Sequence, residues 1–202
     1  MTILSVNKTR ERWAQYALIF MGTIVPIFLF LEDFMGKKSR FIAHSAMIGA
    51  LYVALTYLQN FIIPNSTSFV IQFRASEALC VLALFTPAAI PGLTLGCLLF
   101  NISYAGALPL DFLVGCLATL LATGGMYLLR NLTVKGYPLV AMLLPAVSNG
   151  LLVGWELMVY IGGGFWLNAL YVAIGELAVL LTLGTIVYYG LRSRGLDKRI
   201  FG

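Results

Sequence analysis

The stretch Gln72-Phe73-Arg74-Ala75-Ser76-Glu77-Ala78-Leu79 opens an apolar run that continues to Phe85. Charged residues make up only 10% of the 202-residue chain, against about a quarter in an ordinary soluble domain. At helical spacing, Arg74 and Glu77 lie on the same face of a helix. Ionisable side chains inside a membrane segment are costly and usually face the protein interior or a water-filled cavity. We therefore expect the rest of the chain to build a pocket around this pair.

The composition indicates an integral membrane protein of one domain, because 60% of the residues are hydrophobic and a water-soluble core does not need that much apolar surface. The net charge of +5 does not indicate nucleic-acid binding, since the basic residues gather at the two ends of the chain and in one loop. That pattern is typical of residues that orient a membrane protein. Cys80, Cys97 and Cys116 lie in apolar runs without metal-ligand spacing, so neither a disulfide framework nor a metal site is expected.

Six apolar runs predict an all-α bundle of six membrane helices, over residues 41–60, 74–85, 92–104, 111–129, 139–160 and 166–191. Residues 39–202 are expected to form this membrane domain, and residues 1–38 an N-terminal extension. Within the extension, the apolar run 13–31 predicts one additional hydrophobic helix, either spanning or interfacial. A secretory signal is a competing interpretation, although the run ends in Glu32-Asp33 rather than in small residues suited to cleavage.

The basic residues predict how the six helices are oriented. Arg40, Arg130, Lys135 and the basic tail fall on one side of the membrane, and the opposite loops contain no Lys and no Arg other than Arg74. The positive-inside rule therefore places this side, with the C-terminus, in the cytoplasm. The polar residues then gather in the middle and outer parts of the bundle. The candidates for substrate binding are Gln72, Arg74, Glu77, Asn101, Asp111, Asn149, Glu156, Trp166 and Glu176.

Several of these residues have a structural alternative. Asp111 could be the N-cap of its helix. Arg74 and Glu77 could form a structural ion pair, and Asn101 and Asn149 could be interhelical hydrogen-bonding partners.

Glu176 is the hardest candidate to explain structurally, because a charged residue in the middle of a span costs roughly 2.5–3.5 kcal/mol and no Lys or Arg lies near it in the sequence. Taken as ionised, the candidate pocket contains Arg74 and four carboxylates. Such a pocket should favour a cationic or donor-rich ligand and disfavour anions. The two oxygens of one carboxylate can accept two parallel N–H bonds.

A stripe of small residues, Ala43, Ala46, Ala50 and Ala54, follows the cytoplasmic half of the first core helix. Small residues four apart let another helix approach closely. That helix belongs either to the same protein or to a partner subunit, and the sequence leaves both possibilities open.

These features together resemble the substrate-binding S components of energy-coupling factor (ECF) transporters, and most closely the queuosine-precursor transporter family, QueT. The motifs that carry the resemblance are Ala46-xxx-Ala50 with Leu51-Tyr52, the run from Ile71 to Leu79, Gly96 to Asn101, Ser148 to Leu157, Phe165-Trp166, and Gly175-Glu176-Leu177. The likeness covers about residues 40–195.

The resemblance implies a subunit without cofactor or catalytic residues, in a prokaryotic plasma membrane, that captures a 7-deazaguanine such as 7-aminomethyl-7-deazaguanine from outside. Its implied partners are a transmembrane coupling subunit (T component), which docks on the first core helix, and two cytoplasmic ATPase subunits. In this interpretation Glu176 or Glu156 takes the guanine edge, and another carboxylate takes the amine. Arg74 and Gln72 close the mouth of the pocket, and Trp166 stacks on the ring.

Three alternatives remain open. The first is an S component for another donor-rich nutrient, such as a thiamine precursor. The second is an intramembrane enzyme, but the single histidine, His44, is expected far from the carboxylates, which argues against a metal site or a nucleophile–histidine pair there. The third, a purely structural membrane protein, would leave Glu176 unexplained. Gly36-Lys37-Lys38-Ser39 lacks the residue order of a phosphate-binding loop, so ATP hydrolysis is expected from partner subunits.

Overall fold

The computed structural model describes residues 36–64, 66, 73–104, 107–193 and 195–201. The additional helix expected at 13–31 and the site candidate Gln72 lie outside these residues. The described chain is helical, and it contains one isolated β-bridge, between Val134 and Tyr137. Four of its helices are long and apolar enough to cross a membrane. The predicted all-α membrane fold is therefore confirmed.

The helices follow the predicted apolar runs closely. In chain order they are α2 (Lys37–Ile62), η1 (Ala75–Leu84), α3 (Ala89–Ser103), α4 (Asp111–Leu128), α5 (Leu139–Tyr160), α6 (Phe165–Val179), η2 (Leu180–Gly184), α7 (Thr185–Ser193) and α8 (Leu196–Phe201). The α6, η2 and α7 segments together make one long apolar helix, Phe165–Ser193. α3 begins three residues before the expected Gly92, because Pro91 fits the first turn of a helix, where a missing N–H costs nothing. The short α8 in the tail was not predicted.

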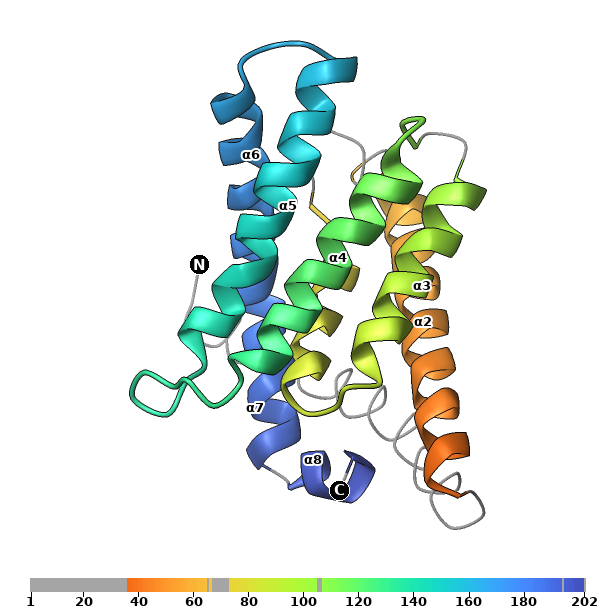
Figure 1. Ribbon diagram of the computed structural model, residues 1–202, viewed down its shortest axis with the longest axis vertical. Coiled ribbons are helices and arrows are strands. Elements are labelled where there is room, and N and C mark those ends of the chain that lie inside the picture. The colour runs from red at the N-terminus through yellow and green to blue at the C-terminus, as the bar shows by residue number, and fades with distance from the viewer. Residues whose placement is uncertain (1–35, 65, 67–72, 105–106, 194, 202) are drawn as a thin grey trace, which may run out of the picture.

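η1 lies at the centre of the bundle. α2, α3, α4, α5 and α6 each pack on the next in chain order, and η1 contacts all of them as well as α7 (Figure 1). Residues Ser76 to Leu84 of η1 are all buried, as expected for a helix that is apolar on every side beyond its first turn. This position brings Arg74 and Glu77, at the start of η1, into the interior of the ring of helices.

η1 is a 3-10 helix of ten residues, whereas 3-10 runs longer than about four residues are uncommon. α2 holds its first turn. The backbone N–H of Ala75 donates to Gln59 Oε1 at 2.6 Å, and Thr56 Oγ1 donates to Ser76 Oγ at 2.8 Å. α2 thus fixes the first turn of η1, which contains Glu77. Because side chains three residues apart eclipse each other in a 3-10 helix, the orientation of this turn also sets the direction of the Glu77 side chain.

Glycines set the closest helix crossings. A Cβ atom on Gly92 of α3 would lie 2.6 Å from the carbonyl oxygen of Ser45 on α2. A Cβ on Gly154 of α5 would lie 2.6 Å from Cα of Ala169 on α6. Backbones in membrane bundles approach this closely where small residues line the crossing. The second crossing fixes the separation of the two helices that carry Asn149 and Glu176.

The described basic residues other than Arg74 belong to segments at one end of the bundle. These segments are the start of α2, the turn between α4 and α5, and the end of α7 with α8, which lie together at the bottom of Figure 1. The turns between α3 and α4 and between α5 and α6 lie at the opposite end. The basic residues therefore share one side, as predicted. The assignment of that side to the cytoplasm stays a prediction.

Candidate functional site

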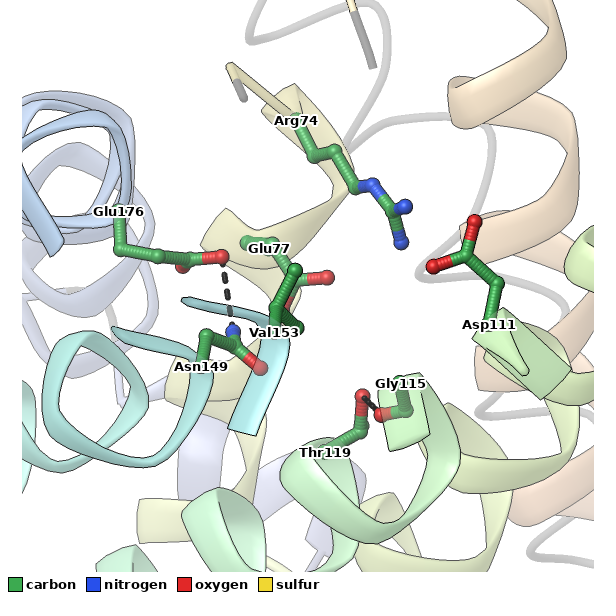
Figure 2. Close-up of a pocket in the computed structure, with 8 residues that line it drawn as sticks. All are labelled: Arg74, Glu77, Asp111, Gly115, Thr119, Asn149, Val153 and Glu176. Carbon is green, nitrogen blue, oxygen red and sulfur yellow. Dashed lines mark hydrogen bonds between the residues drawn. The ribbon is translucent and has the colours of Figure 1, made fainter. Parts of the chain in front are cut away.

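A cavity lies between η1, α4, α5 and α6 (Figure 2). Because Asp111 in its lining is the first residue of α4, the cavity lies in the half of the bundle near the α3–α4 turn, away from the basic end (Figure 1). Its lining residues are Arg74, Glu77, Asp111, Gly115, Thr119, Asn149, Val153 and Glu176. Its volume is about 10 Å³, close to what a single water molecule needs. The side chains of this polar site are therefore drawn closely together in the structure.

Glu176 on α6 is 6% exposed and is held by α5. Asn149 Nδ2 donates to Glu176 Oε1 at 2.8 Å, the contact drawn as a dashed line in Figure 2. The other carboxylate oxygen, Oε2, is buried and accepts no hydrogen bond from a described residue. Burying a charged acceptor without a donor costs more than burying a neutral one, and such groups in native structures call for an explanation. Glu176 Oε2 can accept a hydrogen bond from a ligand.

Glu77 is the second buried carboxylate in the cavity, and it is held from two sides. Tyr52 Oη on α2 donates to Glu77 Oε1 at 2.6 Å. Cys80 Sγ, one turn further along η1, donates to Oε2 at 3.2 Å. Glu77 therefore has a fixed orientation before any ligand arrives.

Arg74 and Asp111 lie on opposite sides of the cavity, and Figure 2 shows the guanidinium and the carboxylate pointing toward each other. Asp111 Oδ2 accepts the backbone N–H of Leu108 at 2.8 Å. The N-cap of α4 is Leu110, without a side-chain capping bond. The alternative interpretation of Asp111 as the N-cap is thus wrong: it is the first residue of α4, and its carboxylate holds the preceding turn.

The structure brings Arg74, Glu77, Asp111, Asn149 and Glu176 to the cavity. The other described candidates lie elsewhere. Asn101 on α3 supports Asp111 from behind, because its Nδ2 donates to the Asp111 carbonyl at 2.8 Å. Glu156 is fully buried next to Asp111 but is not part of the lining.

Trp166 is 76% exposed, and its ring packs edge-on against Phe165. Its position does not support the expected stacking on a ligand in the cavity.

Sequence reasoning missed several residues of the site. Gly115 and Thr119 line the cavity with Asp111, and Val153 lines it with Asn149. Their spacing could have identified them, because these residues follow Asp111 and Asn149 at intervals of four, and residues four apart share one face of a helix. Tyr52 was missed as a site residue, although it lies one turn beyond Ile48 and Gly49 on the buried face of α2.

The alanine stripe lies on the opposite face of α2 from the helix contacts. Ala46, Ala50 and Ala54 are exposed and Ala43 is partly buried. Gly49, on the other side, packs against Gly92 and Gly96 of α3. No described helix of the protein therefore covers most of the stripe.

The family model of the QueT transporter matches residues 42–193, most of the chain and all of the cavity. The chain therefore belongs to the QueT transporter family, which confirms the resemblance and identifies a membrane transport protein. No curated protein and no solved structure gives a significant match.

Proposed function

We propose that this member of the QueT transporter family is the substrate-binding subunit of an ECF-type importer, and that it binds a queuosine precursor, a 7-deazaguanine such as 7-aminomethyl-7-deazaguanine. The observation that carries the proposal is the buried carboxylate of Glu176, with one oxygen held by Asn149 and the other without a donor. The guanine-type edge of such a ligand presents adjacent N–H donors, and a carboxylate accepts parallel N–H bonds with high geometric specificity.

The cavity offers complementary groups around that edge. Glu176 accepts the ring N–H groups, while Asn149 keeps the carboxylate in place. Glu77, held by Tyr52 and Cys80, provides further acceptors, and Val153 offers an apolar contact for the flat ring. Pockets of this kind use a few fixed polar groups to orient a ligand.

The ligand enters by displacing side chains, because a volume of about 10 Å³ does not accommodate a bicyclic ring. Arg74 is the side chain that moves. It starts at the N-cap of η1 and lies across the cavity toward Asp111 (Figure 2). When it swings away, the site opens toward the end of the bundle that faces outside.

The exposed alanine stripe of α2 supports docking on a transmembrane coupling subunit. Ala46, Ala50 and Ala54 form a surface on which a partner helix can approach closely. In this arrangement the basic end of the bundle, with the C-terminus, faces the cytoplasm of a prokaryotic cell. Two ATPase subunits on that side drive uptake.

The test is equilibrium binding of 7-aminomethyl-7-deazaguanine to the purified protein in detergent, with the pyrimidine precursor of thiamine as competitor. The proposal predicts saturable binding that the pyrimidine does not displace. Displacement by the pyrimidine at similar concentrations would instead support the alternative of a thiamine-precursor transporter. A folded protein that binds neither compound would overturn the assignment of the substrate.

A further inference from the structure

A pair of acidic side chains lies at the end of the cavity near the α3–α4 turn, Asp111 in the lining and Glu156 buried behind it. Asp111, the first residue of α4, lines the cavity. Glu156 on α5 is close enough to Asp111 for their charges to interact. Glu156 is 0% exposed, and neither of its carboxylate oxygens accepts a hydrogen bond from a described residue.

Two ionised carboxylates in contact cannot donate to each other, and their charges repel. Removing them from water without a compensating positive charge is strongly unfavourable. The fully buried position of Glu156 therefore requires a positive charge or a proton between the two groups.

The nearby basic residue is Arg74, whose charge acts on Glu156 and Glu176 alike. It is also the only basic side chain among the described residues that line the cavity. One guanidinium thus shares the cavity with the carboxylates of Glu77, Asp111 and Glu176, with Glu156 buried behind Asp111, and cannot neutralise all four. A positively charged ligand group would reduce this imbalance beside Glu156, whose two carboxylate oxygens have no donor among the described residues.

The spacing on α5 connects this pair to the deeper part of the site. Asn149, Val153 and Glu156 follow at intervals of four and three residues, so they share one face of the helix. Asn149 holds Glu176 in the deep part, and Val153 lies between Asn149 and Glu156. A ligand whose donor edge meets Glu176 would therefore extend along this face toward Asp111 and Glu156.

We propose that Asp111 and Glu156 form a subsite for a positively charged group of the ligand, which makes the protein selective for cationic over neutral ligands of the same shape. Asp111 contacts the charged group, and Glu156 strengthens the negative field from behind. This inference rests on the proposed function for the identity of the ring. It adds a requirement on the charge of the substituent.

The test compares two ligands that differ in charge and hardly in shape. These are 7-aminomethyl-7-deazaguanine, which is a cation, and the corresponding 7-hydroxymethyl compound, which is neutral. The cation adds an attraction between opposite charges that the neutral hydroxyl group lacks, so the protein should bind the cation at least about tenfold more tightly. Glu156→Gln should remove most of this preference by weakening the cation alone, with affinity for the neutral compound unchanged within about twofold.

Asp111→Asn provides a second variant, because an amide oxygen can still accept the N–H of Leu108. It should show the same selective loss. The matched control is Asp197→Asn in α8, at the opposite end of the molecule, which should change neither affinity.

Equal affinity of the unmodified protein for both compounds would overturn the inference and leave the proposed function standing. A Glu156→Gln variant that loses both ligands equally would also overturn it, because that result indicates a purely structural role. If the folded protein binds neither compound, the proposed function fails and the inference fails with it.

Discussion

The two halves of the bundle are built from the same helices but differ in the side chains that fill their interiors. In the half near the α3–α4 and α5–α6 turns, the interior contains the charged groups of the cavity. In the other half, the interior is an apolar cluster that includes Val81, Leu84, Met126, Met142 and Leu180. η1 runs through both, since Glu77 lies in its first turn and Leu79 to Leu84 are buried in the cluster.

This difference indicates a site with one entrance rather than a pore through the protein. A conducting path needs polar groups or water along its whole length, and the apolar cluster interrupts such a path. The cost of burying carboxylates in a membrane protein is high, and it is confined to the half where a ligand would bind. Substitutions in one half, each with a matched change elsewhere in the molecule, test this division.

The largest loss of ligand binding is expected from a substitution that forces α5 and α6 apart where they cross most closely, in the polar half. Gly154→Leu would place a side chain where even a Cβ atom lies 2.6 Å from Cα of Ala169, so α5 and α6 must separate. Overpacking of this kind costs about 1–3 kcal/mol or more. We expect a lower unfolding temperature and no measurable binding of 7-aminomethyl-7-deazaguanine.

The matched control is Gly124→Leu on α4, since a Cβ at this position meets no atom within 4 Å. It should unfold near the temperature of the unmodified protein and bind normally. The account is contradicted if the two glycine variants behave alike.

An intermediate loss of ligand affinity is expected from removing the phenol oxygen of Tyr52. Tyr52→Phe deletes the hydrogen bond from Tyr52 Oη to Glu77 at 2.6 Å, which leaves a buried carboxylate oxygen without its donor. We expect about a tenfold loss of ligand affinity, as for a hydrogen bond to a charged group. Tyr188→Phe is the corresponding change in the apolar half, where the phenol accepts a hydrogen bond from Arg192. Isothermal titration should show normal affinity for Tyr188→Phe; a similar loss in both variants would mean that Tyr52 acts only through general stability.

The smallest effect on binding is expected at the outer surface of α2. Ala50→Trp adds a bulky ring to the exposed alanine stripe, which should block docking of a coupling subunit without reaching the cavity. Uptake of labelled ligand by cells that contain the complete transporter should then be lost, with affinity in detergent unchanged. Leu99→Trp, on an exposed position of α3, should retain both. Normal uptake by Ala50→Trp would remove the proposed role of the stripe.

The helices could be predicted from the sequence because their apolar runs are separated by clear breaks. α5 begins and ends at Leu139 and Tyr160, as predicted, since a basic turn precedes it and a glycine-rich turn follows it. The 3-10 form of η1 could not be predicted, because eight of its ten residues are apolar and all from Ser76 to Leu84 are buried, which leaves no periodicity that distinguishes one helix type from another.

The cavity lining could be predicted where a charge in an apolar run is hard to explain structurally, as for Glu176. It was not predictable for Trp166, because an aromatic ring near a helix end suits a ligand site and a membrane interface equally well. The adjacency of Glu156 and Asp111 was also inaccessible, since it depends on how α4 and α5 cross. Tyr52 gave no charge signal, and its role follows only from its position opposite Glu77.

The most direct measurement is a binding titration of 7-aminomethyl-7-deazaguanine against the purified protein and its Glu176→Gln variant. The substitution keeps the shape of the side chain and the contact with Asn149, but it removes the charge and one acceptor. Loss of a bidentate, charge-assisted contact predicts affinity weaker by about a hundredfold, with an unchanged unfolding temperature. Equal affinity of the two proteins would contradict the central claim that the polar half of the bundle holds the ligand.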